Sequence, residues 1–195
     1  AWVFVLAMAA VRPSLAAPPS TQSATAVFAG GCFWCIEADF EKLPGVLDVE
    51  SGYTGGHVPD PDYEQVSAGG TGHAEAVRVR YDPARVSYAA LLDYFWKHID
   101  PTVEDRQFCD TGSQYRSAIF PATDEERRAA EASRDALVAS GRFAKVFTTI
   151  EPAAAFHPAE EYHQDYYRKN PLRYAYYRRS CGRDARVAEL WGTAH

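Results

Sequence analysis

The spacing of hydrophobic positions changes several times along this chain, and each change predicts a new element of secondary structure. Short apolar or alternating runs predict β-strands, and apolar positions three or four residues apart predict amphipathic helices. The expected strands cover residues 25–29, 46–53, 74–81, 116–120 and 146–150. The expected helices cover residues 32–43, 87–99, 123–140 and 158–167. Residues 52–74, rich in Gly, Pro and Asp, lack a period and predict a long loop that is functional or disordered.

The order of these elements, β-α-β-β-α-β-α-β, predicts the fold class. It does not alternate strictly enough for a doubly wound parallel sheet. It favours an α+β two-layer sandwich with a ferredoxin-like core, in which helices pack on a mixed or antiparallel sheet. Thr123 with Glu126 three residues later predicts a capping box at the start of the third helix.

Length and composition predict one folded domain. The chain has 195 residues, of which 47% are hydrophobic, enough to bury a core. Its formal net charge of −6 argues against nucleic acid as the main partner, because phosphate binding requires clustered Lys and Arg. A basic cluster near the C-terminus is expected to be a solvated face; it consists of Arg178, Arg179, Arg183 and Arg186.

The first residues differ from the rest of the chain. Residues 1–10 are almost wholly apolar, and a run of small residues that resembles a cleavage site follows at positions 14–17. We expect residues 1–24 to be a signal-peptide remnant and linker before a single domain at 25–195, with a location outside the cytoplasm, periplasmic or secreted. The alternative is a mis-assigned start ahead of a cytoplasmic enzyme. The apolar run is too short to span a bilayer.

Cys32 is the main candidate for chemistry. Gly30 and Gly31 allow a tight turn out of a strand, and Cys32 then opens a helix, where unpaired N–H groups and the helix dipole favour a thiolate. We therefore expect the pKa of Cys32 to lie below that of a free thiol. Such a thiol is a nucleophile.

Cys35 lies one helical turn after Cys32, so the two sulfurs can form a disulfide. A bare C-x-x-C is equally compatible with redox chemistry, metal binding and coincidence. Structural zinc usually requires a second pair of ligands, whereas Cys109 and Cys181 stand alone in the sequence. The metal interpretation is therefore the weaker one.

Several segments of the chain, in order, resemble one family. They are Gly31-Cys-Phe-Trp34, Gly52-Tyr-Thr-Gly-Gly56, Tyr63-Glu-Gln-Val66, Gly72-His-Ala-Glu-Ala-Val77, Gln114-Tyr-Arg-Ser-Ala-Ile119 and Ala159-Glu-Glu-Tyr-His-Gln-Asp-Tyr166. Together they are similar to the A-type peptide methionine sulfoxide reductases, over roughly residues 25 to 170. The resemblance implies reduction of methionine S-sulfoxide, free or in proteins, as repair of oxidative damage, without a metal or organic cofactor.

The resemblance also implies roles for individual residues. Glu75 corresponds to the general acid that protonates the sulfoxide oxygen, and Tyr63 and Tyr115 to hydrogen-bond donors to that oxygen. Asp110 corresponds to a carboxylate that orients the substrate, and Phe33 with Trp34 to the hydrophobic wall for its methyl group. The alternation along residues 74–81 adds that Glu75 points with Val77 and Val79, away from Arg78 and Arg80, so we do not expect it in a salt bridge with either arginine.

Recycling of the enzyme is open at this point. A sulfenic acid on Cys32 has to condense with a second thiol, and both Cys35 and Cys181 are candidates. Cys35 is favoured by its position in the helix, and Cys181 is an alternative resolver or a relay to a thioredoxin-like reductant. Cys109 resembles a small buried hydrophobic residue and receives no role.

We expect a monomer, with neither nucleic acid nor membrane as partner.

Two other functions remain compatible with parts of the sequence. A thiol–disulfide oxidoreductase of thioredoxin type also places C-x-x-C at a helix start, although it does not need a buried acid such as Glu75. A non-catalytic module could capture methyl groups in an aromatic pocket and would not need the Cys32 thiol.

Overall fold

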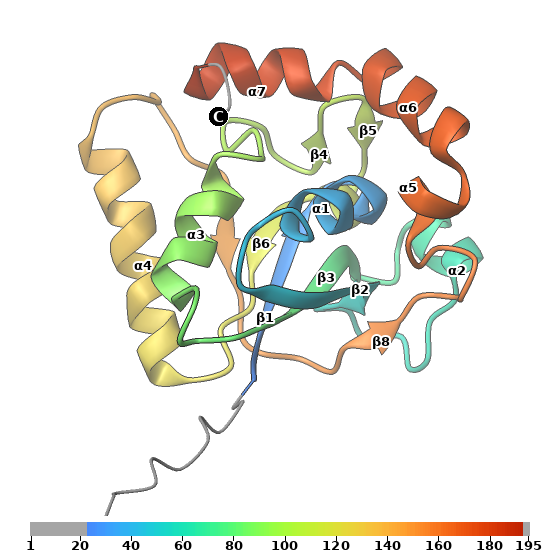
Figure 1. Ribbon diagram of the computed structural model, residues 1–195, viewed down its shortest axis with the longest axis horizontal. Coiled ribbons are helices and arrows are strands. Elements are labelled where there is room, and N and C mark those ends of the chain that lie inside the picture. The colour runs from blue at the N-terminus through green and yellow to red at the C-terminus, as the bar shows by residue number, and fades with distance from the viewer. Residues whose placement is uncertain (1–22, 193–195) are drawn as a thin grey trace, which may run out of the picture.

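A six-stranded sheet forms the centre of the molecule in the computed structural model, which describes residues 23–192 (Figure 1). Its strands are β1 (Ala24–Gly30), β2 (Val46–Thr54), β3 (Ala74–Tyr81), β6 (Ser117–Ile119), β7 (Thr149–Ile150) and β8 (His157–Pro158). A separate small hairpin consists of β4 (Arg106–Gln107) and β5 (Asp110–Thr111), followed by the 3₁₀ turn η1 (Ser113–Tyr115). The helices are α1 (Phe33–Phe40), α2 (Tyr63–Ala68), α3 (Tyr88–Trp96), α4 (Asp124–Ala139), α5 (Tyr166–Lys169), α6 (Pro171–Ser180) and α7 (Arg183–Trp191).

The strand order β7-β6-β1-β3-β2-β8 confirms the predicted fold class. β3 lies between β1 and β2, and β1 lies between β3 and β6, with all three pairings antiparallel. This is the split arrangement of a ferredoxin-like core. The added pair β6–β7 is parallel, so the sheet is mixed.

One face of the sheet carries the main hydrophobic core. Phe28 of β1 and Val77 of β3 pack there with Ile36 of α1 and Phe95 of α3, all almost completely buried. Small residues of the other face, among them Ala76, form a separate cluster with Phe120 and the partly buried Phe156. The two helices on the first face form the second layer of the predicted sandwich.

The alternation along β3 places its residues as predicted. Val77 and Val79 belong to the main core, and Glu75 is buried on the same side. Arg78 and Arg80 belong to the alternate positions of β3, and they pair with carboxylates of β2: Arg78 with Glu50, and Arg80 with Asp48 at 3.8 Å. Glu75 is therefore left available for chemistry, which excludes a structural salt bridge with either arginine.

The helix predicted over residues 158–167 is wrong. Residues 161–165 are turn, and α5 begins only at Tyr166. The Gln164 amide bonds both the N–H and the C=O of Ser51 in β2 at 2.9 Å, so the segment is held to the sheet edge by a side chain. Asp165 then takes a left-handed backbone conformation, with φ of 52°, which interrupts any helix before α5.

Other boundaries also differ. The strand predicted over residues 146–150 is reduced to β7, and the predicted loop at 52–74 contains α2, capped by Asp62 and Gln65. The predicted N-cap Thr123 is confirmed, because its hydroxyl accepts a hydrogen bond from Glu126 N–H, but the reciprocal half of the capping box is wrong: the Glu126 carboxylate accepts a hydrogen bond from Ala122 N–H and not from Thr123 N–H. The signal-peptide remnant and linker predicted for residues 1–24 lie, apart from the last two residues, outside the described part. Between residues 23 and 192, no helix is long and apolar enough to cross a membrane.

Candidate active site

The site is built around the junction between β1 and α1. Gly31, with φ of 80°, turns the chain there, and a Cβ on it would approach the Cβ of Gln107 to 2.4 Å. Cys32 follows as the N-cap of α1, which confirms its predicted place at a helix start. Both Cys32 and Cys35 are buried and carry free thiols.

Glu75 reaches this helix terminus from the neighbouring strand β3. The backbone N–H of Phe33 donates a hydrogen bond to Glu75 Oε2 at 3.0 Å, so the carboxyl group lies next to Cys32. Burial raises the pKa of Glu75 to about 8, although the bond from Phe33 acts in the opposite direction. Glu75 is therefore protonated at neutral pH, the state that a general acid requires.

Tyr63 and Tyr115 face the same space. Burial raises the pKa of each phenol, and the nearby charges at Glu75 and Cys32 raise both further. Both hydroxyls consequently stay protonated and can donate hydrogen bonds. Asp110 belongs to the same cluster; burial raises the pKa of its carboxyl group, and its neighbour Tyr177 donates a hydrogen bond to it.

The two aromatic residues after Cys32 lie in different environments. Phe33 is 1% exposed and packs within the core, with its ring centre 5.8 Å from that of Tyr53 and 5.0 Å from that of His163. Trp34 is only half-buried, and it stacks on Tyr166 at 3.8 Å. Its Nε1 donates to His163 Nδ1 at 3.0 Å, which fixes the orientation of the indole. Trp34 thus offers a rigid apolar surface beside Cys32, with Phe33 behind it.

The expectation of a lowered pKa for Cys32 is wrong. Burial raises the pKa of Cys32 well above its usual range, and the hydrogen bond it donates to Cys35 and the charge of Glu75 raise it further. For Cys35, the hydrogen bond from Cys32 lowers the pKa to about 7, with help from Arg183 and Arg178. The helix terminus favours a thiolate at Cys32, but desolvation outweighs it, so the pKa of Cys32 rises.

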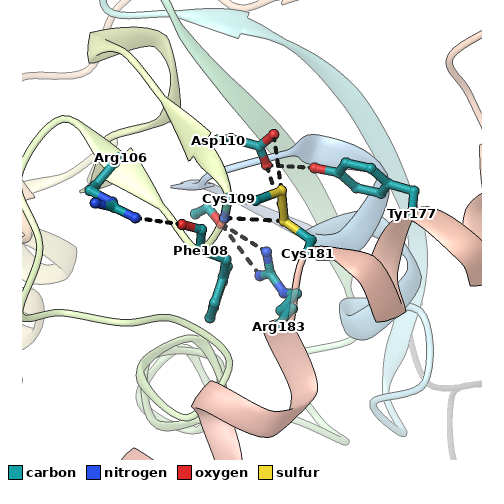
Figure 2. Close-up of a disulfide and its surroundings, with 8 residues drawn as sticks. Arg106, Phe108, Cys109, Asp110, Tyr177, Cys181 and Arg183 are labelled. Carbon is teal, nitrogen blue, oxygen red and sulfur yellow. Dashed lines mark hydrogen bonds between the residues drawn. A yellow bond between two sulfur atoms is a disulfide. The ribbon is translucent and has the colours of Figure 1, made fainter.

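The two remaining cysteines stand alone in the sequence, but in the structure they are bonded to each other as a disulfide. Cys109 and Cys181, 72 residues apart, are joined at a Cα–Cα distance of 4.9 Å (Figure 2). Cys109 is exposed rather than a small buried hydrophobic residue. Asp110 and the two sulfurs lie within 4.8 Å of one another, but sulfurs bonded to each other offer no thiolate to a metal ion. Cys181 has no free thiol here and would need this bond opened before it could meet Cys32.

The C-terminal basic cluster is not a solvated face. Arg183 is 2% exposed, Arg178 is half-buried, and Arg186 binds Asp100 at 2.7 Å. Only Arg179 is exposed among the four. Periodicity could not reveal this for Arg178, because α6 has no apolar stripe and Arg178 is held there by ion pairs with Asp39 and Asp184.

Tyr177 is a site residue that the sequence did not indicate. It lies on α6 and points toward Asp110, to which its hydroxyl donates a hydrogen bond (Figure 2), and it lowers the pKa of Cys32 against the effect of burial. Its ring meets Trp34 edge-on at 5.7 Å. The sequence contains 12 tyrosines, a number that does not single out this position.

Comparison with known proteins assigns the family. The profile described as "Peptide methionine sulfoxide reductase" matches residues 24–195. The peptide methionine sulfoxide reductase MsrA 2 of Caulobacter vibrioides is 50% identical over 185 residues, covering 95% of this chain and 92% of its own length. MsrA of Bacillus licheniformis is 49% identical over 171 residues, covering 87% of this chain and 94% of its own.

Solved structures agree with this assignment. Methionine sulfoxide reductase A of Corynebacterium diphtheriae has a TM-score of 0.68 at 36% identity, over 77% of this chain and 76% of its own. Mxr1 of Saccharomyces cerevisiae in reduced form has a TM-score of 0.71 at 33% identity, over 82% of this chain and 91% of its own. Mxr1 in complex with Trx2 is similar in fold, with a TM-score of 0.51 at 23% identity over 79% and 91%. The chain therefore belongs to the peptide methionine sulfoxide reductase family and is an oxidoreductase of its A type.

Proposed function

We propose that this chain reduces methionine S-sulfoxide, free or in proteins, through a sulfenic acid on Cys32 that Cys35 resolves. The observation that carries the proposal is the carboxyl group of Glu75, buried and bonded to the first turn of α1 beside Cys32, where burial raises its pKa to about 8. Disulfide exchange does not need such an acid, whereas transfer of an oxygen from sulfur does.

In the first step, the Cys32 sulfur attacks the sulfoxide sulfur while Glu75 donates its proton to the oxygen. Tyr63 and Tyr115 donate hydrogen bonds to that oxygen, because their phenols remain protonated. A bond forms between the two sulfurs. It and the sulfur–oxygen bond of the substrate then break as the protonated oxygen passes to the Cys32 sulfur, which becomes a sulfenic acid, and the proton released by the Cys32 thiol restores the carboxyl group of Glu75. The substrate sulfur is reduced to the thioether of methionine, and the Cys32 sulfur is oxidised by the same two electrons.

In the second step, Cys35 attacks the sulfenic acid, the sulfur–oxygen bond breaks, and water leaves as the Cys32–Cys35 disulfide forms. Cys35 is preferred to Cys181 because it is free and one turn away on the same helix, whereas Cys181 is bonded to Cys109. Opening of that bond would be needed for the relay through Cys181, which stays a secondary proposal.

A dithiol of thioredoxin type then reduces the new disulfide by thiol–disulfide exchange. Mxr1 of Saccharomyces cerevisiae has been crystallised with Trx2, which supports a reductant of this class for the present chain. Each reduction of a sulfoxide therefore consumes the two thiols of the reductant and releases one water molecule. The enzyme itself returns to its starting state. This cycle serves the repair of oxidised methionine.

The proposal is tested by NADPH consumption with thioredoxin, thioredoxin reductase and a methionine sulfoxide peptide of defined sulfur configuration. Glu75→Gln should lower the rate by about 10²-fold or more, since an amide has no proton to give. Glu64→Gln, a change in an exposed carboxylate of α2, serves as the matched control. Full turnover by the Glu75 variant, or equal activity on both epimers, would contradict the proposal.

A further inference from the structure

One hydrogen bond joins α6 to the carboxylate that begins β5. The hydroxyl of Tyr177 donates it to Asp110 Oδ2 (Figure 2). Among residues 23–192, Tyr177 is the only N–H or O–H donor to this carboxylate. The sulfurs of Cys109 and Cys181 lie 3.7 and 4.0 Å from its oxygens, but they are bonded to each other and carry no hydrogen to donate. Removal of the Tyr177 hydroxyl would therefore leave a half-buried carboxylate without its donor.

The Cys109–Cys181 disulfide joins the same two segments of the chain. Cys109 directly precedes Asp110, and Cys181 lies one helical turn after Tyr177, whose C=O accepts the Cys181 N–H at 2.9 Å. The disulfide and the hydrogen bond thus close a ring between the β4–β5 hairpin and α6 (Figure 2). Because the covalent link already limits the separation of the segments, the hydrogen bond loses less conformational freedom when it forms.

The disulfide acts at the exposed tip of the hairpin. The base is held by Gln107, which is completely buried and forms hydrogen bonds of 2.9 and 2.7 Å with the backbone of Asp100. The tip consists of Phe108 and Cys109. Phe108 has φ of 54°, which is unfavourable for a residue with a Cβ, and Cys109 is exposed. The covalent bond at the tip therefore fixes the position of the adjacent Asp110 relative to α6.

Tyr177 also contacts the apolar side of the site. Its ring meets Trp34 edge-on at 5.7 Å, and the next residue, Arg178, pairs with Asp39 of α1 at 2.9 Å. α6 buries no residue completely, so polar and aromatic contacts of this kind hold the helix in place. Tyr177 is thus the residue of α6 that touches both the polar group expected to bind the substrate, Asp110, and the apolar one, Trp34.

We propose that Tyr177 is a positioning residue that holds the Asp110 carboxylate toward the substrate, and that the Cys109–Cys181 disulfide keeps the two side chains together. This inference rests on the proposed function and on the expected role of Asp110 in orienting the substrate. Affinity for methionine sulfoxide then depends on a bond that exchanges no sulfur with the reacting thiols. Reduction of that bond by a dithiol moves two electrons, leaves two thiols on the protein and converts the dithiol to its own disulfide. Such a reduction should weaken substrate binding.

Several charged or titratable groups act electrostatically on Asp110. They are Tyr63 on α2, Glu75 on β3, Tyr115 on η1, Tyr177 on α6 and Arg183 on α7. Arg183 acts through its charge, because its terminal nitrogens donate instead to the carbonyl oxygens of Gly30 at 3.3 Å and His98 at 2.9 Å. Burial raises the pKa of Asp110, and the hydrogen bond from Tyr177 opposes this rise. Loss of the Tyr177 hydroxyl should therefore raise that pKa further.

The test measures binding without reaction. In the Cys32→Ser protein, isothermal titration calorimetry with a methionine S-sulfoxide peptide gives the dissociation constant. Tyr177→Phe, which keeps the ring, should weaken binding about tenfold, because the carboxylate loses its hydrogen-bond donor. Tyr176→Phe, a change in the neighbouring residue of α6 whose side chain is 77% exposed, is the matched control and should leave binding unchanged.

Opening of the disulfide should reproduce this effect. Cys109→Ser with Cys181→Ser in the Cys32→Ser background, or dithiothreitol treatment of the Cys32→Ser protein, should weaken binding in the same direction. Addition of Tyr177→Phe to the double cysteine variant should weaken it less than the product of the two separate losses, because both changes act through the same carboxylate.

The pH dependence of binding provides a readout that a purely structural role would not change. Binding should weaken as pH falls through the pKa of Asp110, because protonation removes the negative charge. Tyr177→Phe should move this decline to higher pH, since its hydroxyl opposes protonation of the carboxylate. Asp110→Asn should bind weakly throughout and should not show the decline.

The inference is overturned by unchanged affinity in Tyr177→Phe, by equal changes in Tyr177→Phe and Tyr176→Phe, by losses that multiply when Tyr177→Phe and the cysteine changes are combined, or by an acid decline that stays at the same pH in Tyr177→Phe. If the double cysteine variant does not fold, the two tyrosine variants and their pH profiles decide. The measurement involves no turnover, so its failure is distinct from failure of the proposed function, which full turnover by Glu75→Gln would demonstrate.

Discussion

The molecule contains two pairs of cysteines that differ in almost every physical respect. Cys32 and Cys35 are three residues apart, buried and free, whereas Cys109 and Cys181 are 72 residues apart and bonded to each other. The first pair lies at the start of α1, where the buried carboxyl group of Glu75 reaches the helix. The second ties an exposed hairpin to a helix junction. The surroundings, more than the sulfur chemistry, separate a reactive pair from a constraining one.

We expect the largest effect from removing the resolving thiol of the first pair and, in a separate variant, the disulfide of the second pair. Cys35→Ser should still form one methionine per enzyme molecule, but should lose repeated turnover with thioredoxin, because the sulfenic acid has no resolving partner. Cys109→Ser with Cys181→Ser should keep repeated turnover. Quantification of methionine in single and multiple turnovers measures both. The opposite pattern would make Cys181 the resolver and assign Cys35 a supporting part.

The constraining pair should affect the free energy of unfolding instead. Closure of a 72-residue loop restricts the unfolded chain, so loss of the bond in Cys109→Ser with Cys181→Ser should cost about 4 kcal/mol. Urea denaturation of the oxidised proteins measures the difference. Pretreatment of the unmutated protein with dithiothreitol should bring its stability to that of the double variant. An unchanged midpoint and slope would show that the bond does not hold the fold.

The smallest expected effect is the pH dependence of the rate, which the protonation of Glu75 should determine. Glu75 has to be protonated to act, so the rate of the first turnover should fall as pH rises through about 8. The sign for stability is the same: a carboxyl group with a raised pKa stabilises the fold fully below its unfolded pKa and loses this contribution as pH rises through the folded value. Glu75→Gln should abolish the alkaline decline in the residual rate. A decline that survives this change would belong to another group.

The local sequence pattern was sufficient to predict the surroundings of Cys32, but it was insufficient to predict the bond between Cys109 and Cys181. The turn at Gly31, the helix start at Cys32 and the orientation of Glu75 follow from neighbours in sequence, and the structure confirms each. The bond between Cys109 and Cys181 depends on the placement of α6, which buries no residue completely and carries no clear apolar period. Non-local pairing of this kind is set by tertiary contacts, which a single sequence does not display.

The charge on Cys32 was mispredicted for a related reason. The helix terminus is a local feature and favours a thiolate, but the degree of burial is a property of the whole fold. The same applies to the arginines of the C-terminus, which look solvated in sequence and close over α1 in space. Electrostatics thus required the three-dimensional arrangement, although the participating residues could largely be named beforehand.

The contact of Arg183 with the carbonyl oxygen of Gly30 joins residues 153 positions apart. During synthesis on a ribosome, β1, α1 and both reactive thiols emerge long before the arginines that complete their surroundings. A nascent chain that ends before α6 therefore lacks the side chain that bonds the backbone at Gly30, next to the turn into α1. The surroundings of the two thiols are complete only after α6 and α7 have been synthesised and have packed in place.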